Sequence, residues 1–273
     1  MKFSSQDILF GSSLIFDDKK PDRVKYFLDN MENNKAYRYK IIDKSNQEKK
    51  IILKNMIEDY LSYRKGWKNQ PINSFQQKMY GNKFEKNNNS PLCFDLEVAS
   101  VCDLACGFCY RQYVSTPDKI MKKDLAFKLI DQAAKLKVPS MKFNWRGEPL
   151  LNPQLPEIIN YAKKNGILET IINTNATKLD EKMSEKIINS GLDIMIYSFD
   201  GGTKEIYEKM RPGRFTKNNF DNIYKNIKNF SKIRNKLKLK FPRTKIQMIL
   251  TDETRKAQSE YFNLFKDIVD EVS

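Results

Sequence analysis

The sequence has 273 residues and contains no histidine. That absence excludes a Ser-His-Asp triad, a Cys-His protease pair, an HExxH zinc site and a two-histidine-one-carboxylate iron site within this chain. It also excludes a histidine general base. Any chemistry must therefore come from thiolates, carboxylates, lysines, tyrosines or a bound cofactor.

Long apolar runs are also absent. No stretch approaches the ~20 apolar residues that span a bilayer, and the N-terminal segment lacks the continuous apolar core and the cleavage site of a signal peptide. We expect a cytoplasmic protein with no membrane partner. The 40% of apolar and 12% of aromatic residues suffice for a sizeable core in one domain, with a small appendage.

Basic residues outnumber acidic ones, with 49 Lys and Arg against 34 Asp and Glu and a net charge of +15. Only 10 of them are arginines, the residue best suited to phosphate recognition, and the lysines are spread along the whole chain. The pattern argues against a nucleic-acid partner. A lysine-rich composition accounts for the net charge. If the positive charge has a function, that function is to attract an acidic electron donor such as flavodoxin or ferredoxin.

The N-terminal region, 1–90, has mixed patterns. It predicts helices over 22–30 and 57–67, a β-hairpin of strands 37–42 and 50–53 around a polar turn, and a polar connection over 81–90. We expect a small mixed α/β region, and we assign it substrate or partner recognition from its position alone.

From Pro91 onward, strand and helix patterns alternate, which predicts a second region over 91–273. The strands are expected at 92–99, 141–145, 169–174, 193–198 and 245–250, and the helices at 120–136, 155–164, 181–189, 203–210, 218–234 and 257–269. Such alternation predicts an α/β fold in which a parallel sheet is joined by helical crossovers. In these folds chemistry gathers at the carboxyl ends of the strands.

Within the first strand, apolar residues alternate with Asp95 and Glu97. If the apolar face meets the helices of a barrel, both carboxylates point inward. An inward carboxylate is costly unless it is paired or functional. We expect a structural pair with a lumen lysine or arginine, and a functional role is the alternative.

Three of the four cysteines, Cys102, Cys106 and Cys109, lie within eight residues. Soft thiolates suit iron–sulfur clusters and zinc, and Gly107 is expected to permit a tight turn between them. A 4Fe-4S cluster normally takes four cysteines, so three would leave one iron open to a small molecule. Cys93 is either a buried thiol or the fourth ligand of a closed site.

The spacing C-x3-C-x2-C directly after a first strand resembles the radical S-adenosylmethionine (SAM) superfamily. The resemblance implies a partial parallel (β/α) barrel in which Cys102, Cys106 and Cys109 hold a 4Fe-4S cluster with SAM on its open iron. It implies reductive cleavage of SAM to methionine and a 5′-deoxyadenosyl radical that abstracts hydrogen from a substrate. The cofactor does the difficult chemistry and the protein orients it.

Further motifs strengthen the resemblance. The segment after the second strand reads Arg-Gly-Glu-Pro, with Arg146 in place of the first glycine of the family's GGEP motif, and a Ser-x-Asp-Gly segment ends the fourth strand. An Asn-Thr-Asn segment follows the third strand, with Ala176 where glycine is common. The residues that would contact SAM are Phe108, Gly147, Glu148, Pro149, Ser198, Asp200 and Arg211.

Within the superfamily, these motifs are most similar to those of the peptide-modifying, SPASM-type branch, whose C-terminal extension carries auxiliary clusters. No cysteine follows Cys109, and five strand–helix units are predicted where the core usually has six. We therefore expect a core that is incomplete at the C-terminus. The substrate would be a peptide or protein side chain, or a sugar metabolite of the cell surface.

Two other interpretations stay open at this point. The first is a non-catalytic iron–sulfur or zinc module for binding or electron transfer, in which Cys93 completes the ligand set. The second is a basic nucleic-acid-binding protein with a structural metal, for which no aromatic–basic motif is present.

Overall fold

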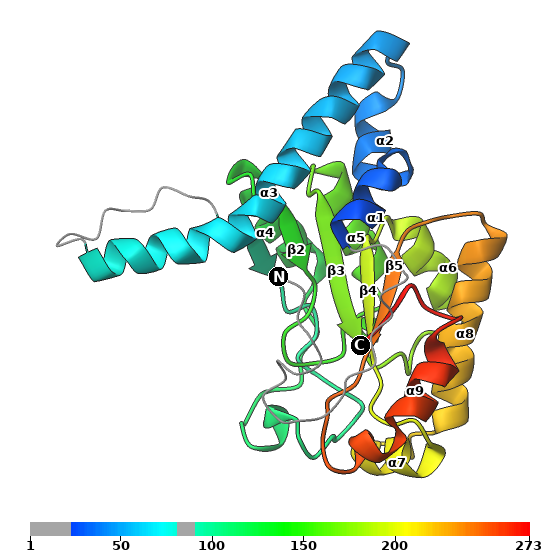
Figure 1. The fold of residues 1–273 in the computed structure, drawn as a ribbon. Coiled ribbons are helices and arrows are strands. Elements are labelled where there is room, and N and C mark those ends of the chain that lie inside the picture. The colour runs from blue at the N-terminus through cyan, green and yellow to red at the C-terminus, as the bar shows by residue number, and fades with distance from the viewer. Residues whose placement is uncertain (1–22, 81–90) are drawn as a thin grey trace.

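A six-stranded parallel sheet lies at the centre of the computed structural model, which describes residues 23–80 and 91–273 (Figure 1). The strands follow one another in chain order across the sheet: β1 (Cys93–Asp95), β2 (Ser140–Lys142), β3 (Glu169–Thr174), β4 (Ile194–Ser198), β5 (Arg243–Gln247) and β6 (Glu271–Val272). This order, with a helical crossover after each strand from β1 to β5, confirms the predicted partial parallel barrel.

The crossover helices bury their apolar stripes against the sheet. They are α4 (Lys123–Lys135), α5 (Leu155–Lys164), α6 (Glu181–Ser190), α7 (Lys204–Met210), α8 (Phe220–Lys236) and α9 (Gln258–Phe265), with short 3-10 turns at Tyr110–Gln112, Pro149–Leu151 and Thr254–Ala257. The ends of α6 show why these residues form a helix. The Asp180 side chain accepts a hydrogen bond from the backbone N–H of Met183, and Gly191 ends the helix with a φ of 91°.

Several predicted elements match the structure closely, and others differ for local reasons. The predicted bounds of β3 and α5 are those observed. The first strand is shorter than expected because Ala99 leaves the sheet and forms an antiparallel bridge to Ile120. The prediction of five strands was one short, since β6 has only two residues and gives no periodic pattern. On α4, Leu125 is exposed, and the buried stripe runs through Ala126, Ile130 and Ala133.

The predicted N-terminal hairpin is wrong. The described part of this region forms α1 (Arg23–Asp29), a 3-10 turn (Met31–Asn33), α2 (Lys35–Ile41) and α3 (Asn46–Tyr80). A capping box begins α3, because Ser45 Oγ accepts from the N–H of Glu48 while the Glu48 carboxylate accepts from the N–H of Ser45. The polar segment interpreted as a hairpin turn is therefore a helix start. The predicted helix over 57–67 lies within α3, and the predicted connection 81–90 lies outside the described residues.

Helices α1 to α3 cover the end of the sheet opposite to the carboxyl ends of the strands (Figure 1). The buried Glu169 begins β3 and accepts hydrogen bonds from the hydroxyls of Tyr60, at 3.2 Å, and Tyr63, at 2.9 Å, and it also pairs with Arg23. A second buried carboxylate, Asp193, precedes β4. The amino-terminal ends of the strands are thus closed by charged and hydrogen-bonded contacts to the N-terminal helices.

The 35-residue helix α3 runs past the edge of the sheet and changes direction part-way along (Figure 1). Pro71 lies inside the helix, where it removes one backbone hydrogen bond and favours a kink. Among the described residues, no helix combines the length and the apolar character needed to cross a membrane.

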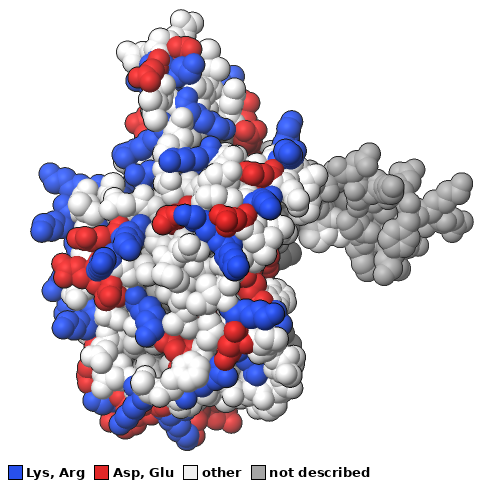
Figure 2. Space-filling model, turned by 180° about the vertical axis from the view of Figure 1, so that it is seen from behind, with Lys and Arg blue, Asp and Glu red and all other residues white. Residues whose placement is uncertain are grey.

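The charged side chains follow no single patch on the face seen in Figure 2. Blue Lys and Arg side chains alternate there with red Asp and Glu side chains over most of the surface. The basic side chains are therefore dispersed on that face, as the spread of lysines along the sequence predicted.

Candidate active site

The three clustered cysteines lie on a loop that follows β1 at the carboxyl end of the sheet. Two backbone hydrogen bonds tie this loop to a distant segment: the N–H of Ala105 donates to the carbonyl of Pro212, and the N–H of Arg214 donates to that of Asp103, both at 2.8 Å. An antiparallel bridge pairs Leu104 with Gly213 between them. The cysteine loop is thus one side of a small two-stranded structure, held in place by residues a hundred positions later.

Two of the thiols have polar neighbours that favour a thiolate or sulfide. The Nδ2 of Asn175 lies 3.9 Å from Cys102 Sγ, and the Nη1 of Arg211 lies 3.9 Å from Cys106 Sγ. Burial raises the pKa of the Cys102 thiol to about 12, and the Glu148 carboxylate adds to that rise. Burial also raises the pKa of Cys106, while Arg211 lowers it. The thiols of Cys102 and Cys106 are therefore protonated at neutral pH, and a metal that binds them would displace their protons.

The donor set fits an iron–sulfur cluster better than a single ion. In residues 23–80 and 91–273, no three His, Cys, Asp or Glu side chains are grouped to hold one metal ion. A cluster binds each thiolate at a different iron, so its ligands need not converge on one point. The Arg211 guanidinium beside Cys106 would balance the negative charge of such a group.

Cys93 lies apart from the loop. It begins β1, it is half-buried, and its Sγ lies 3.9 Å from the Oδ1 of Asp95. It lines an open cavity on the sheet that none of the three loop cysteines lines. The structure therefore gives no support to Cys93 as a fourth ligand.

The loop after β2 is built around Gly147, which lies against the chain entering the cysteine loop. A Cβ atom at Gly147 would lie 2.3 Å from the carbonyl oxygen of Ala99 and 2.5 Å from that of Val101. The N–H of Glu148 donates to the same Val101 carbonyl at 2.9 Å. By contrast, a Cβ at Gly107 would meet nothing within 4 Å and its φ is not positive. The expected need for glycine at 107 is thus not borne out, and the need lies at 147.

Arg146, the departure from the family motif, has a clear structural role. Its backbone N–H and its Nε both donate to Glu97 Oε1 at 2.9 Å, and its Nη2 donates to Oε2 at 2.5 Å. This pair joins the exit of β1 to the loop after β2. The predicted pairing of the inward carboxylate with a cation is confirmed for Glu97.

The Glu148 side chain does not face a ligand. It is 2% exposed, and its carboxylate accepts hydrogen bonds from Thr174 Oγ1, from the N–H of Asn175 and from the N–H of Leu150. Burial raises its pKa to about 7. Glu148 and the buried Pro149 thus join the loops after β2 and β3, and only their backbone groups remain for SAM.

Asp200 and Arg211 form a buried pair near the cysteine loop. The Asp200 carboxylate accepts from Arg211 Nε at 2.7 Å and from the N–H of Ile249 at 2.6 Å. The Arg211 guanidinium carbon lies 5.7 Å from the centre of the Phe108 ring, which is 38% exposed. Ser198 is half-buried at the end of β4. The structure therefore brings Cys106, Phe108 and Arg211 together, whereas the Asp200 side chain positions Arg211.

Sequence reasoning missed Asp103, which lies between the first two cysteines. Its carboxylate accepts from Asn175 Nδ2 at 2.9 Å and from Thr177 Oγ1 at 2.6 Å. Its position inside the motif was a signal, but its partners lie more than seventy residues away. At Ala176 the backbone has a φ of 62°, which explains why glycine suits that position.

A family model for the Radical SAM superfamily matches residues 96–256. The chain belongs to the radical SAM superfamily. This family uses a 4Fe-4S cluster and SAM, and its match begins just after β1 and spans every motif described above.

Curated relatives match this chain over less than half of its length. The chain is 32% identical over 108 residues to a tungsten-containing aldehyde ferredoxin oxidoreductase cofactor-modifying protein of Pyrococcus furiosus. This match covers 38% of this chain and 30% of that protein. It is 31% identical over 135 residues to a probable GTP 3′,8-cyclase of Methanococcus maripaludis, covering 49% and 43%. The chain thus matches less than half the length of these relatives.

Solved structures support the radical SAM fold. Streptococcus suis SuiB bound to the precursor peptide SuiA aligns with a TM-score of 0.53 and 17% identity, covering 76% of this chain and 50% of SuiB. The protein anSMEcpe with bound AdoMet aligns with a TM-score of 0.53 and 19% identity, covering 65% and 48%. At this level of identity the likeness concerns the fold.

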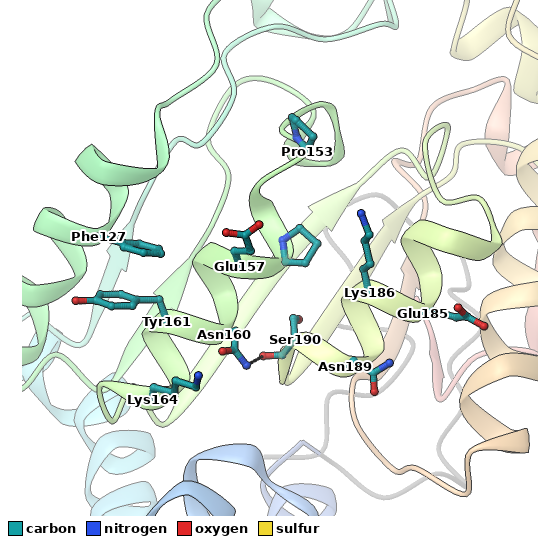
Figure 3. Close-up of a pocket in the computed structure, with 11 residues that line it drawn as sticks. Phe127, Pro153, Glu157, Asn160, Tyr161, Lys164, Glu185, Lys186, Asn189 and Ser190 are labelled. Carbon is teal, nitrogen blue, oxygen red and sulfur yellow. Dashed lines mark hydrogen bonds between the residues drawn. The ribbon is translucent and has the colours of Figure 1, made fainter.

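A groove on the outer, helical side of the radical SAM fold lies away from these motifs (Figure 3). It has a volume of about 610 Å³ and lies between α4, α5 and α6. The stacked rings of Phe127 and Tyr161, 3.9 Å apart, form one wall, and Asn160 donates to the carbonyl of Ser190 at 3.4 Å across another. These contacts join neighbouring helices, so we interpret the groove as a consequence of helix packing.

Proposed function

We propose that this chain is a radical SAM enzyme in which Cys102, Cys106 and Cys109 hold the cluster. The observation that carries the proposal is the placement of the cysteine loop. It lies against the loop after β3 and the segment after α7, with the Asn175 amide and the Arg211 guanidinium 3.9 Å from the sulfur atoms of Cys102 and Cys106. A bound cluster of this family supplies the electron that cleaves SAM to methionine and a 5′-deoxyadenosyl radical, which abstracts hydrogen from substrate.

The residues of this chain have separate tasks in that proposal. Gly147 lets the loop after β2 approach the cysteine loop, so that its backbone groups can bind the SAM amino group. Arg211 is held by Asp200 and balances the negative charge beside Cys106. Phe108 offers an exposed ring face for adenine, and Ser198 lies at the strand end where a ribose contact is expected.

The proposal extends to partner and reaction class. An acidic reductant such as flavodoxin or ferredoxin would suit the basic surface, and the overall reaction would be an oxidation or a group transfer. A substrate among peptide side chains or sugar metabolites, a place in the SPASM-type branch, a recognition role for residues 1–90 and a cytoplasmic location stay predictions from the sequence.

Anaerobic reconstitution of the full chain with iron and sulfide tests the proposal. After reduction with dithionite, SAM should change the electron paramagnetic resonance spectrum, and 5′-deoxyadenosine should accumulate. Cys106→Ser should abolish both signals, whereas Cys93→Ala should keep them. Loss of the metal in Cys93→Ala would favour the non-catalytic module instead, and a well-formed cluster that ignores SAM would refute the proposed activity.

A further inference from the structure

An open cavity of about 880 Å³ lies on the inner face of the sheet, and none of the residues that the proposed function assigns to the cluster or SAM lines it. Residues from β1 to β5 line it together with residues from α1 and α3. Its volume falls in the usual range for small-molecule sites. The cavity is therefore large enough for a compact metabolite.

On β3 and β5, one strand residue that lines the cavity is half-buried next to buried neighbours. On β3, Asn173 is half-buried between buried residues, and on β5 the half-buried Gln247 follows the buried Ile246. This alternation is expected when every second side chain faces an open lumen. Asn173 and Gln247 thus offer their amides to the interior of the partial barrel.

Helix α3 supplies a wall that lies outside the matched family region. Tyr63, Trp67 and Gln70 line the cavity, and Gly66 allows the helix to pack against the Leu92 side chain at the start of β1. Trp67 is 47% exposed, and its ring meets that of Tyr63 edge-on with centres 6.5 Å apart. The lumen therefore has an aromatic wall contributed by the N-terminal region.

The charges of the cavity balance. Asp95 and Lys142 are register partners on β1 and β2, so their opposite charges face the same lumen. The third charged side chain, Arg23, is already paired with Glu169. Within the described lining, no group of free cations is present that would match a triphosphate, so a net-neutral ligand fits best.

One hydrogen-bonding atom in the lining lacks a partner. The Oδ1 of Asn173 is buried and accepts no hydrogen bond from the described residues. A buried acceptor is costly when it stays unpaired, so a ligand that donates to this oxygen once the amide turns toward the cavity gains affinity. A hydroxyl group can donate, whereas an ionised carboxylate or phosphate cannot.

We propose that this cavity binds a neutral, polyhydroxylated ring of the sugar type, with Asn173 and Gln247 as hydrogen-bonding residues and Trp67 as an aromatic wall against the ring face. Calling that ligand the substrate rests on the proposed radical SAM function. Asn173 lies two residues before Asn175, whose side chain neighbours Cys102. Two residues of extended chain separate their backbones by about 7 Å. A ring in the cavity would thus lie within reach of chemistry at the cysteine loop.

Saturation-transfer NMR on the reconstituted full chain, with SAM and without reductant, tests this site. The probes are methyl β-glucopyranoside and N-acetylglucosamine, with GTP and a short peptide as competitors of other classes. Both sugars should receive saturation. Asn173→Ala and Trp67→Ala should each weaken sugar binding about tenfold. The matched control is Asn189→Ala in the outer groove of Figure 3, which should bind as the wild type does.

The outcomes separate the two proposals. No transfer to either sugar, preference for GTP or the peptide, or equal binding by the Asn173→Ala and Asn189→Ala variants would overturn the cavity assignment. The effect of SAM on the cluster spectrum of the same sample reports independently on the radical SAM activity. Sugar binding without that spectral change would keep the site and refute the enzyme.

Discussion

Gly147 has no space for a side chain, because two carbonyl oxygens lie within 2.5 Å of where its Cβ would be. Gly147→Ala should therefore force the loop after β2 away from the cysteine loop and lower the free energy of unfolding by roughly 3 kcal/mol. Urea unfolding of the apo-protein measures the change. Gly107→Ala is the matched control in the cysteine loop itself, where the added methyl meets nothing, and equal losses in both variants would contradict the structure.

A second residue-scale prediction concerns Glu148, whose pKa burial raises from 4.5 to about 7. Between these values the folded protein holds a proton that the unfolded chain has lost. The contribution of this group to stability is therefore complete below about pH 4.5 and is lost as the pH rises through 7, by roughly 3 kcal/mol in total. Urea unfolding over this pH range should show that slope in the wild type, and Glu148→Gln should reduce it. The same slope in both would refute the raised pKa.

Single residues also show how far sequence can predict a site. The cysteines, Gly147 and Arg211 were predicted from their motifs, and the structure brings them to one end of the sheet. The burial of Glu148 and Asp200 was not predicted, because their partners, Asn175 and Ile249, come from other strand ends. Spacing along a chain indicates which residues share a loop, but which side chain turns inward depends on contacts between loops.

At the scale of elements, the buried ion pair of Lys163 and Asp193 joins α5 to the start of β4. Its nitrogen and oxygen lie 2.5 Å apart, and Asn34 at the start of α2 donates to the same carboxylate at 2.7 Å. Lys163→Met should leave Asp193 without its buried counter-charge and destabilise the fold by about 3–5 kcal/mol. Thermal or urea unfolding measures the loss.

An exposed ion pair provides the control for that prediction. Lys204 and Asp221 are 2.8 Å apart, but both side chains are largely exposed. Lys204→Met should change stability by no more than about 1 kcal/mol. An equally small loss of stability in Lys163→Met would contradict the predicted contribution of the buried pair.

Elements with strong local signals were predicted well. Gly166 and Gly191 indicated where α5 and α6 end, whereas the N-terminal hairpin was wrong because the capping box of Ser45 and Glu48 was overlooked. Strand β6 has two residues and exists only through its pairing with β5. Its cause is tertiary, so no local pattern could have indicated it.

At the scale of the whole molecule, the charge of +15 predicts how the protein would meet a reductant under the proposed function. Reduction of the cluster by an acidic flavodoxin should slow several-fold as ionic strength rises, since salt screens the attraction that speeds encounter. Stopped-flow absorbance measures this rate. Reduction by the cationic dye methyl viologen should not slow with salt, and a flavodoxin rate that ignores salt would contradict electrostatic attraction.

The ties between the cysteine loop and distant segments constrain how the protein matures. Asp103 binds Asn175 and Thr177, and the backbone around Leu104 pairs with Pro212–Arg214. During synthesis, the cysteines leave the ribosome roughly seventy residues before Asn175 and Thr177, and roughly a hundred before Pro212–Arg214. The loop can take its final shape only after that later stretch has emerged, so iron–sulfur assembly factors would receive a chain synthesised at least as far as Arg214.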